Sequence, residues 1–179
     1  MIRYILVLLL VAGGTFAYIQ YKNKSTVYDS QIKSASERHQ VPFSLIKAVI
    51  RKESSFIASQ KGDAGEFGLM QIMPIAADEW SRLTNRPKIK NYSVLMDPSI
   101  NIDIGTYLLS VNLKRWEKYE DATALALAEY NAGLGNLRKN NWAPENYDEK
   151  IIERITFPMT KNYVRDILEY RTQYLEHDK

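Results

Sequence analysis

A run of small and aliphatic residues between Asp121 and Asn131 most constrains how this chain can fold. Nearly every position from 122 to 128 is alanine or leucine, so a helix in this segment would be apolar almost all round. Helices of this kind are buried in the middle of a domain, with other elements packed on every side. Asp121 is a typical helix N-cap, and Gly133 can supply a left-handed stop. We therefore predict a central buried helix from Asp121 through Asn131.

The rest of the chain after Val27 predicts further helices and no alternating strand of useful length. Apolar periodicity and start signals predict helices at 28–39, from Phe43 after Pro42, at 75–83 after Pro74, from Asp97-Pro98 to about Lys118, at 147–155 and at 159–176. Residues 85–96 are expected to form a loop. Residues 58–72 contain glycines and no sustained period, so we expect a loop or a short irregular hairpin there. The predicted fold class is all-α with a small irregular lobe.

Composition excludes several classes of site. The chain has 179 residues, which is enough for one domain with its own core, and it has no cysteine for a disulfide or a thiol nucleophile. Its two histidines, His39 and His177, lie in polar helical surroundings, so no metal site is predicted. No glycine-rich phosphate loop indicates a nucleotide cofactor. Lysine and arginine are scattered and the net charge is +3, which gives no support for nucleic-acid binding and suits either an acidic polymer or an ordinary solvated surface.

The first 24 residues form a separate unit. The stretch from Tyr4 to Tyr21 carries no charge, and about 18 helical residues would span roughly 27 Å, close to the thickness of a bilayer core. We predict a membrane anchor over residues 1–24, ahead of a single domain over residues 25–179. The alternative is a cleaved signal peptide, because Thr15-Phe16-Ala17 resembles a small-x-Ala cleavage site. Both readings predict a protein of the cell envelope, anchored in one case and secreted in the other.

Glu53 is the residue whose position points to chemistry. At about 100° per residue, a helix that begins at Phe43 brings Glu53 onto the same side as four aliphatic residues, while Lys47 and Arg51 face away. Burial disfavours the charged form of a carboxyl group and raises its pKa. An acid that stays protonated near neutral pH can donate its proton to a substrate. The alternative is a helix that frays at Ser54 and releases Glu53 to water.

Several motifs follow one another in order over about residues 35–170. They are Glu53-Ser54-Ser55-Phe56, then Gly65 with Gly68-Leu69-Met70-Gln71-Ile72-Met73-Pro74, then Asp97-Pro98 with Asn101-Ile102 and Gly105, then Ala128-Glu129-Tyr130-Asn131-Ala132-Gly133, and last Glu153, Phe157 and Tyr163-Val164. This set resembles the signature of the soluble lytic transglycosylase (SLT) domain. These enzymes cleave bacterial peptidoglycan and belong to the lysozyme-like group. The resemblance implies a lysozyme-like helical domain.

The resemblance also implies a reaction that needs one carboxyl group and no cofactor. Glu53 would protonate the glycosidic oxygen between N-acetylmuramic acid and N-acetylglucosamine, and the N-acetyl group would stabilise the muramyl cation. Glu53 would then deprotonate the C6 hydroxyl, which attacks C1 of the same sugar and leaves a 1,6-anhydromuramyl end. Most glycosidases need a second carboxyl group. Asp63, Glu66 and Glu129 have no evident place beside Glu53, so none is expected to act as one.

The same resemblance implies which residues contact the peptidoglycan glycan strand, and where this chain departs from the family. The implied substrate-binding residues are Ser54, Gln71, Met73, Tyr130, Asn131, Glu153 and Tyr163. Gly62 stands where the family often has a serine, Glu66-Phe67 replaces small residues, and Met159-Thr160-Lys161 stands in place of Glu-Thr-Arg. These departures concern glycan preference rather than the acid. Two alternatives stay open: a goose-type lysozyme that uses water, and a non-catalytic wall-binding scaffold.

Overall fold

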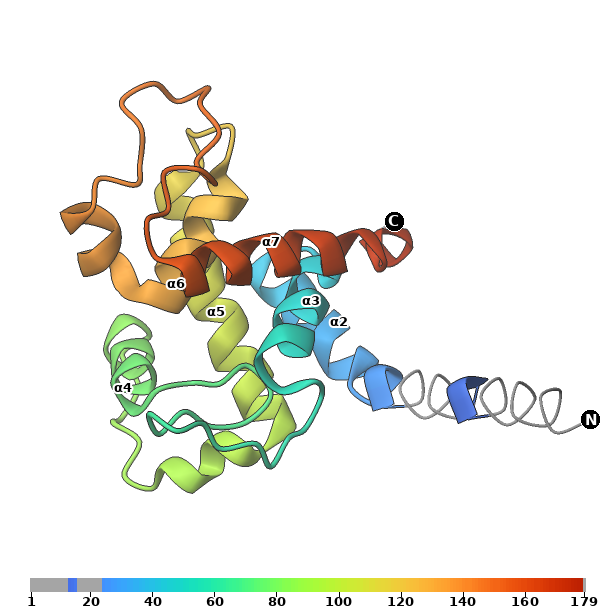
Figure 1. Ribbon diagram of the computed structural model, residues 1–179. Coiled ribbons are helices and arrows are strands. Elements are labelled where there is room, and N and C mark those ends of the chain that lie inside the picture. The colour runs from blue at the N-terminus through green and yellow to red at the C-terminus, as the bar shows by residue number, and fades with distance from the viewer. Residues whose placement is uncertain (1–12, 16–23, 179) are drawn as a thin grey trace, which may run out of the picture.

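The fold is built from helices throughout the part of the chain that the structure describes. The computed structural model describes residues 13–15 and 24–178, and within these ranges it contains no β-strand apart from isolated bridges (Figure 1). The α-helices are α2 (Asp29–His39), α3 (Phe43–Ser54), α4 (Pro74–Leu83), α5 (Pro98–Trp116), α6 (Ala122–Lys139) and α7 (Pro158–Thr172), with short 3₁₀ helices η1 (Tyr92–Met96) and η2 (Leu175–Asp178). The all-α prediction is confirmed for these residues.

The predicted membrane segment lies almost entirely outside the described residues. Of the stretch from Tyr4 to Tyr21, only Gly13, Gly14 and Thr15 fall within them. In the described part of the chain, no helix combines the length and the apolar character that crossing a bilayer requires.

Helix α6 occupies the centre of the domain, as predicted. All residues from Ala124 to Ala128 are buried, and α5 and α7 pack on this helix. Gly133 interrupts the helix close to its expected end. Its φ of 81° is positive as expected, its ψ of 150° is extended, and a second helical segment continues to Lys139. Asp121 does not cap α6 with its side chain, because its carboxylate accepts a hydrogen bond of 2.9 Å from the Ile151 N–H instead.

Helix α3 is more deeply buried than its apolar stripe predicts. Helix α7 packs along it and α2 lies on another side. Lys47, expected on an exposed face, is only 2% exposed, and its ammonium group pairs with Asp29 on α2 at 2.6 Å. Arg51 lies with its guanidinium group over the ring of Tyr170 on α7. The expected solvent-facing side of α3 is therefore covered by neighbouring helices that its own sequence does not reveal.

The predicted helix at 147–155 is wrong, because this segment forms turns. Ile151 and Ile155 are buried, which explains their apolar spacing. The backbone bonds nevertheless run to the start of α6: the Tyr147 carbonyl accepts from the Glu120 N–H at 2.9 Å, and the Ile151 N–H donates to Asp121. These long-range bonds take the place of intrahelical ones. The predicted loop at 85–96 also contains a short helix, η1.

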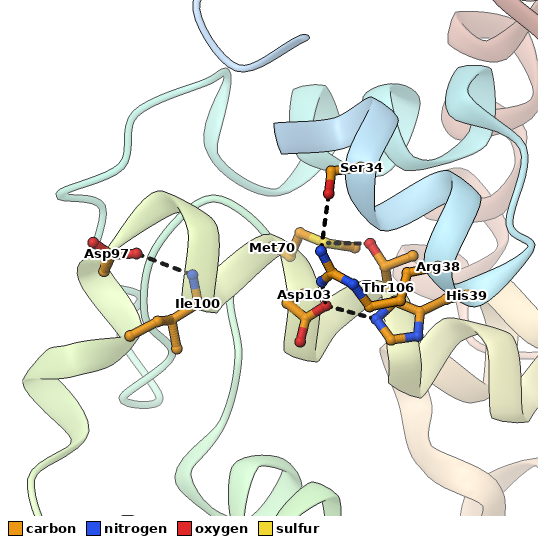
Figure 2. A network of polar contacts seen from close by, with 8 residues as sticks. All are labelled: Ser34, Arg38, His39, Met70, Asp97, Ile100, Asp103 and Thr106. Atoms are coloured by element: carbon orange, nitrogen blue, oxygen red, sulfur yellow. Dashed lines mark hydrogen bonds and ion pairs between the residues drawn. The ribbon is translucent and has the colours of Figure 1, made fainter. Parts of the chain in front are cut away.

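A polar network joins α2 to α5 (Figure 2). Arg38 donates to the Asp103 carboxylate, and His39 Nε2 lies 2.7 Å from the same Asp103 oxygen. Two residues further along α5, Gly105 lets Met70 approach closely, since a Cβ atom there would lie 2.5 Å from the Met70 sulfur. Helix α5 begins as predicted, with Asp97 accepting a hydrogen bond from the Ile100 N–H at 3.0 Å.

The irregular lobe lies at one end of α5. Figure 1 shows α4 and the segment before it gathered there, while α6 and α7 lie toward the other end. The hairpin expected over residues 58–72, called the hairpin segment below, is present as isolated bridges that pair Phe67 with Lys61 and with Ile72. The lobe and the larger group of helices meet where α3 ends, which is where Glu53 lies.

Candidate active site

Glu53 lies in the last turn of α3, and the helix does not fray around it. Ser55 adopts a left-handed conformation (φ 49°, ψ 40°), and its N–H donates to the Arg51 carbonyl at 3.1 Å. The flanking residues Ser54 and Phe56 are both buried, at 6% and 1% exposure. The alternative that the helix end releases Glu53 to water is therefore wrong. The helix terminus is packed, and Glu53 itself stays partly buried.

The pKa of Glu53 is raised from 4.5 to about 7. Desolvation by burial is the largest cause, and the nearby charge of Glu66 raises the pKa further. The hydroxyl of Tyr163 opposes this by donating a hydrogen bond of 2.6 Å to Oε1 of Glu53, and Lys52 also lowers the value. A carboxyl group with this pKa is present in both protonation states at neutral pH, which is what proton donation followed by proton removal requires.

Two tyrosines from different helices complete the surroundings of Glu53. Tyr163 on α7 is 4% exposed, and Tyr130 on α6 donates a hydrogen bond of 3.0 Å to the Met70 carbonyl. Burial raises the pKa of both phenols well above the ordinary value, and the charge of Glu53 adds to the shift. Both therefore remain neutral hydrogen-bond donors. Helices α3, α6 and α7 thus each contribute one side chain to a single polar cluster.

Asn101 holds the hairpin segment in place beside this cluster. Its side chain is fully buried and makes three hydrogen bonds of 2.7 Å: it accepts from the Met70 N–H and donates to the carbonyls of Phe67 and Leu95. Gly68 has a φ of +74°, and a Cβ atom there would collide with the Asn101 amide. This explains why both residues belong to the motif. Sequence reasoning assigned no role to Asn101, because its partners are backbone groups distant in sequence.

Four of the predicted substrate-binding residues line one cavity of about 360 Å³. The cavity lies between α4, α5 and α6. The predicted residues on its wall are Gln71, Met73, Tyr130 and Asn131. Tyr130 connects the cavity with Glu53, because the Glu53 charge is close enough to raise the pKa of this phenol. The cavity walls are otherwise largely apolar, with Ile75 and Leu108 among them.

Ser54 and Glu153 are placed differently from the other predicted contacts. The hydroxyl of Ser54 is buried and donates to the Leu69 carbonyl at 2.9 Å, so it ties α3 to the hairpin segment. The Glu153 side chain is 72% exposed and pairs with Lys161 at 2.9 Å and Arg165 at 2.7 Å. The hydrogen bond from Lys161 is the main reason that the pKa of Glu153 is lowered. Neither residue lines the cavity.

The three other acidic residues considered for a second carboxyl group, Asp63, Glu66 and Glu129, differ in their surroundings. Glu129 is 7% exposed and is bound by Arg115 at 3.1 Å and by the Trp116 indole N–H at 2.7 Å, so it is a buried ion pair. Asp63 is exposed. Glu66 lies close enough to Glu53 for its charge to raise the pKa of that carboxyl group. The expectation that none of these acids serves as a second catalytic carboxyl group stays a prediction. Among the described residues, no group of three or more histidine, cysteine or acidic side chains is arranged to hold a metal ion.

Comparisons with known proteins agree with this arrangement. A family model described as "Transglycosylase SLT domain" matches residues 30–154. The chain is similar to the soluble lytic murein transglycosylase of Escherichia coli strain K12, with 32% identity over 92% of this chain and 25% of the relative. It is also similar to the membrane-bound lytic murein transglycosylase C of Salmonella arizonae, with 32% identity over 62% of this chain and 32% of the relative.

Solved structures show the same fold. The 70-kDa soluble lytic transglycosylase of Escherichia coli superposes with a TM-score of 0.75 at 28% identity, over 85% of this chain and 24% of that one. An inactive mutant of the lytic transglycosylase Slt from Pseudomonas aeruginosa gives 0.74 at 29% identity, also over 85% and 24%. The chain therefore spans about a quarter of the length of these proteins.

Proposed function

This chain belongs to the transglycosylase SLT domain family, and from that membership we propose that it is a peptidoglycan lytic transglycosylase. Its substrate is the bond between N-acetylmuramic acid and N-acetylglucosamine, and its product carries a 1,6-anhydromuramyl end. The names of its relatives support the class of polymer. The observation that carries the proposal is the Glu53 carboxyl group, with its pKa of about 7 and its hydrogen bond from Tyr163.

Glu53 acts first as an acid. Tyr163 occupies Oε1 as a donor, so the acidic proton is carried on Oε2. Transfer of this proton to the glycosidic oxygen leaves a carboxylate, and the Tyr163 hydrogen bond strengthens because its acceptor has become charged. The same contact therefore stabilises the charge that develops during bond cleavage.

Glu53 then acts as a base. The carboxylate removes the proton of the muramyl C6 hydroxyl while that oxygen attacks C1 of the same sugar. A hydroxyl group held within the substrate has a high effective concentration relative to water, so the intramolecular reaction is favoured. A pKa of about 7 suits both steps, because it places the group near the operating pH for proton transfer in either direction.

The glycan occupies the cavity between α4, α5 and α6. Gln71, Met73, Tyr130 and Asn131 line this cavity, which supports their assignment as substrate-binding residues. The side-chain oxygen Oδ1 of Asn131 accepts a hydrogen bond of 2.8 Å from the Thr160 hydroxyl, so the side-chain Nδ2 of Asn131 points away from Thr160 and can donate to the glycan. Tyr163 contacts Glu53 and serves the reaction through it.

The products decide between this proposal and its alternatives. Purified protein incubated with peptidoglycan is expected to release muropeptides about 18 mass units lighter than hydrolytic products, because the C6 oxygen replaces water as the nucleophile. The reaction should create no new reducing ends. Reducing muramic acid that carries oxygen from labelled water would instead identify a goose-type lysozyme. Binding to peptidoglycan without any cleavage would identify a wall-binding scaffold.

We also propose that residues 1–24 attach the protein to the membrane, with the catalytic domain facing the wall. The uncharged stretch from Tyr4 to Tyr21 supports this assignment, as does the similarity to a relative named as membrane-bound. In that arrangement the domain acts on peptidoglycan within the cell envelope. Cleavage of the same segment as a signal peptide would release the domain from the membrane.

A further inference from the structure

Two side-chain oxygens converge over Gly62 on the hairpin segment. A Cβ atom added at Gly62 would collide with the carboxylate of Glu66 and would lie 2.7 Å from Oε1 of Gln71. The absence of a side chain at residue 62 therefore makes room for both groups. The Ala64 N–H holds the Glu66 carboxylate by donating to its Oε2 at 3.1 Å. The carboxylate and the amide oxygen thus flank one position.

The orientation of the Gln71 amide is determined by its hydrogen bonds. Its Nε2 donates to the Gly68 carbonyl at 2.7 Å and to the Gln60 carbonyl at 3.3 Å. Both partners are acceptors, so only the nitrogen of the amide can face them. Oε1 must therefore point the other way, toward the Glu66 carboxylate. Two hydrogen-bond acceptors face each other at this position.

No donor of the described chain joins these two acceptors. No described side chain forms an ion pair with Glu66, and no described group donates to Oε1 of Gln71. The arrangement also lies near Glu53, because the Glu66 charge raises the pKa of that carboxyl group. Oε1 of Gln71 is not among the described buried polar atoms that lack a partner, so it is open to a ligand, and among the described groups only the Ala64 N–H holds Glu66. Such a pair is suited to a ligand that brings an N–H group and no competing acceptor to this position.

We propose that Glu66 is a specificity-determining residue that, together with Gln71, accepts the acetamido N–H of the sugar whose C1 reacts. This proposal rests on the proposed function and deepens it. The N–H of an acetamido group is a donor only. Its binding to the acceptor pair turns the acetamido carbonyl oxygen away from the two protein oxygens and leaves it free to approach C1. The pair thereby selects an amino sugar that carries the N-acetyl group at C2.

The electron flow of the reaction explains why a carboxylate suits this position. The acetamido carbonyl oxygen forms a bond to C1 as the bond from C1 to the leaving oxygen breaks, and the leaving oxygen takes its proton from Glu53. Positive charge develops on the acetamido nitrogen, where the Glu66 carboxylate stabilises it. The C6 oxygen then bonds to C1, the acetamido oxygen leaves C1, and the C6 proton passes to Glu53. No other reactant is needed.

Three variants test this inference. Glu66→Gln removes the charge at constant size, and Gly62→Ala displaces the carboxylate without changing it. Asp63→Asn is the matched control, because Asp63 is an exposed acid of the same hairpin segment. Turnover of peptidoglycan is expected to fall at least tenfold in kcat for Glu66→Gln and Gly62→Ala, with a smaller change in KM. Asp63→Asn should behave like the wild type, and all three should melt near the wild-type temperature.

A binding measurement separates this role from a structural one. Chitotetraose, the tetramer of N-acetylglucosamine, carries an acetamido N–H at C2 of every sugar. Calorimetry in a Glu53→Gln background should show at least tenfold weaker binding of chitotetraose after Glu66→Gln, and no change after Asp63→Asn. Cellotetraose, which has a hydroxyl at C2 in place of the acetamido group, should show no dependence on Glu66.

Equal turnover in Glu66→Gln and Asp63→Asn would overturn the inference. So would a Glu66→Gln protein that loses only incorporation of labelled water, since Glu66 would then be a base for hydrolysis. Failure of the proposed function looks different, because the wild-type protein itself would then release no anhydro products.

Discussion

The hydroxyl of Tyr163 on α7 lies 2.6 Å from Oε1 of Glu53 on α3 and donates to it. The two residues are 110 positions apart in the sequence, and they meet because α7 packs along α3. Burial raises the pKa of Glu53, and this hydrogen bond lowers it. The value of about 7 therefore depends chiefly on two opposing effects, desolvation of the carboxyl group and the hydrogen bond from α7.

Replacement of Tyr163 by phenylalanine is expected to raise the pKa of Glu53 above 7. The hydrogen bond stabilises the ionised carboxylate, so its loss favours the protonated form. Because the acid acts in its protonated form, the alkaline limb of the pH–activity profile should move to higher pH, while kcat falls. Tyr170→Phe is the matched control on the same helix, and its profile should not move. An alkaline limb that stays in place or moves to lower pH after Tyr163→Phe would contradict this role.

Glu53→Gln should remove nearly all cleavage of peptidoglycan. Glutamine keeps the size of the side chain and an oxygen that can accept from Tyr163, but it cannot donate the acidic proton. Turnover should fall to well under a tenth of wild type. A residual rate above that level corresponds to a barrier change of only about 1.4 kcal/mol, and Glu53 would then not be the acid. Lys52→Gln, next in the chain, is a control that should retain activity.

The same substitution should change stability in a direction set by the pKa shift. The folded pKa of Glu53, about 7, lies above the ordinary 4.5, so the folded protein binds this proton more tightly than the unfolded chain. Stability from this group is present below pH 4.5 and is lost as the pH rises through 7. Relative to the wild type, Glu53→Gln should therefore gain up to about 3 kcal/mol in free energy of unfolding between pH 4 and pH 8.5. Urea denaturation of both proteins at these two pH values measures this gain. A stability difference between variant and wild type that is the same at both pH values would be inconsistent with the raised pKa.

Asn101→Ala is expected to destabilise the fold by about 3 kcal/mol, because it leaves one buried N–H and two carbonyls without their partner. Urea denaturation compares it with Asn112→Ala on the same helix, whose side chain makes one long hydrogen bond of 3.4 Å to Ala126. The control should lose much less. Equal losses in the two variants would show that Asn101 does not hold the hairpin segment.

A protein that begins at Val27 should remain active on peptidoglycan, because it keeps α2, which begins at Asp29, and every candidate site residue after it. The full-length protein should sediment with membranes and resist extraction by high salt if residues 1–24 act as an anchor. Fractionation followed by N-terminal sequencing measures this. A mature N-terminus near Tyr18 in a protein washed free of membranes would identify a cleaved signal peptide instead.

The elements that were predictable are those whose signals are local. The alternating alanine and leucine residues of α6 make this helix apolar on every side, so its burial was predictable from its own sequence. Asp97 caps α5 by accepting from the N–H of Ile100, only three residues ahead. Glu53 was recognisable as the candidate acid for the same reason, because its position on the apolar side of a helix and its motif are both read from a short stretch of sequence. Hydrophobic period and capping depend on neighbours in the sequence.

Only the tertiary structure decided the burial of Lys47, the conformation of residues 147–155 and the influence of Glu66 on Glu53. Lys47 is buried because Asp29 on another helix offers a partner, and residues 147–155 form turns because Asp121 accepts the Ile151 N–H. The charge of Glu66 raises the pKa of Glu53 because the hairpin segment folds back toward the end of α3. Each of these outcomes depends on a partner distant in the sequence, and hydrogen bonds and desolvation are determined by such partners. The sequence by itself determined where most of the helices form and which glutamate is the candidate acid, because these signals are local. The packing of the helices around Glu53, with the hydrogen bond from Tyr163 on α7, determined the pKa of that carboxyl group, because desolvation and hydrogen bonding depend on partners distant in the sequence.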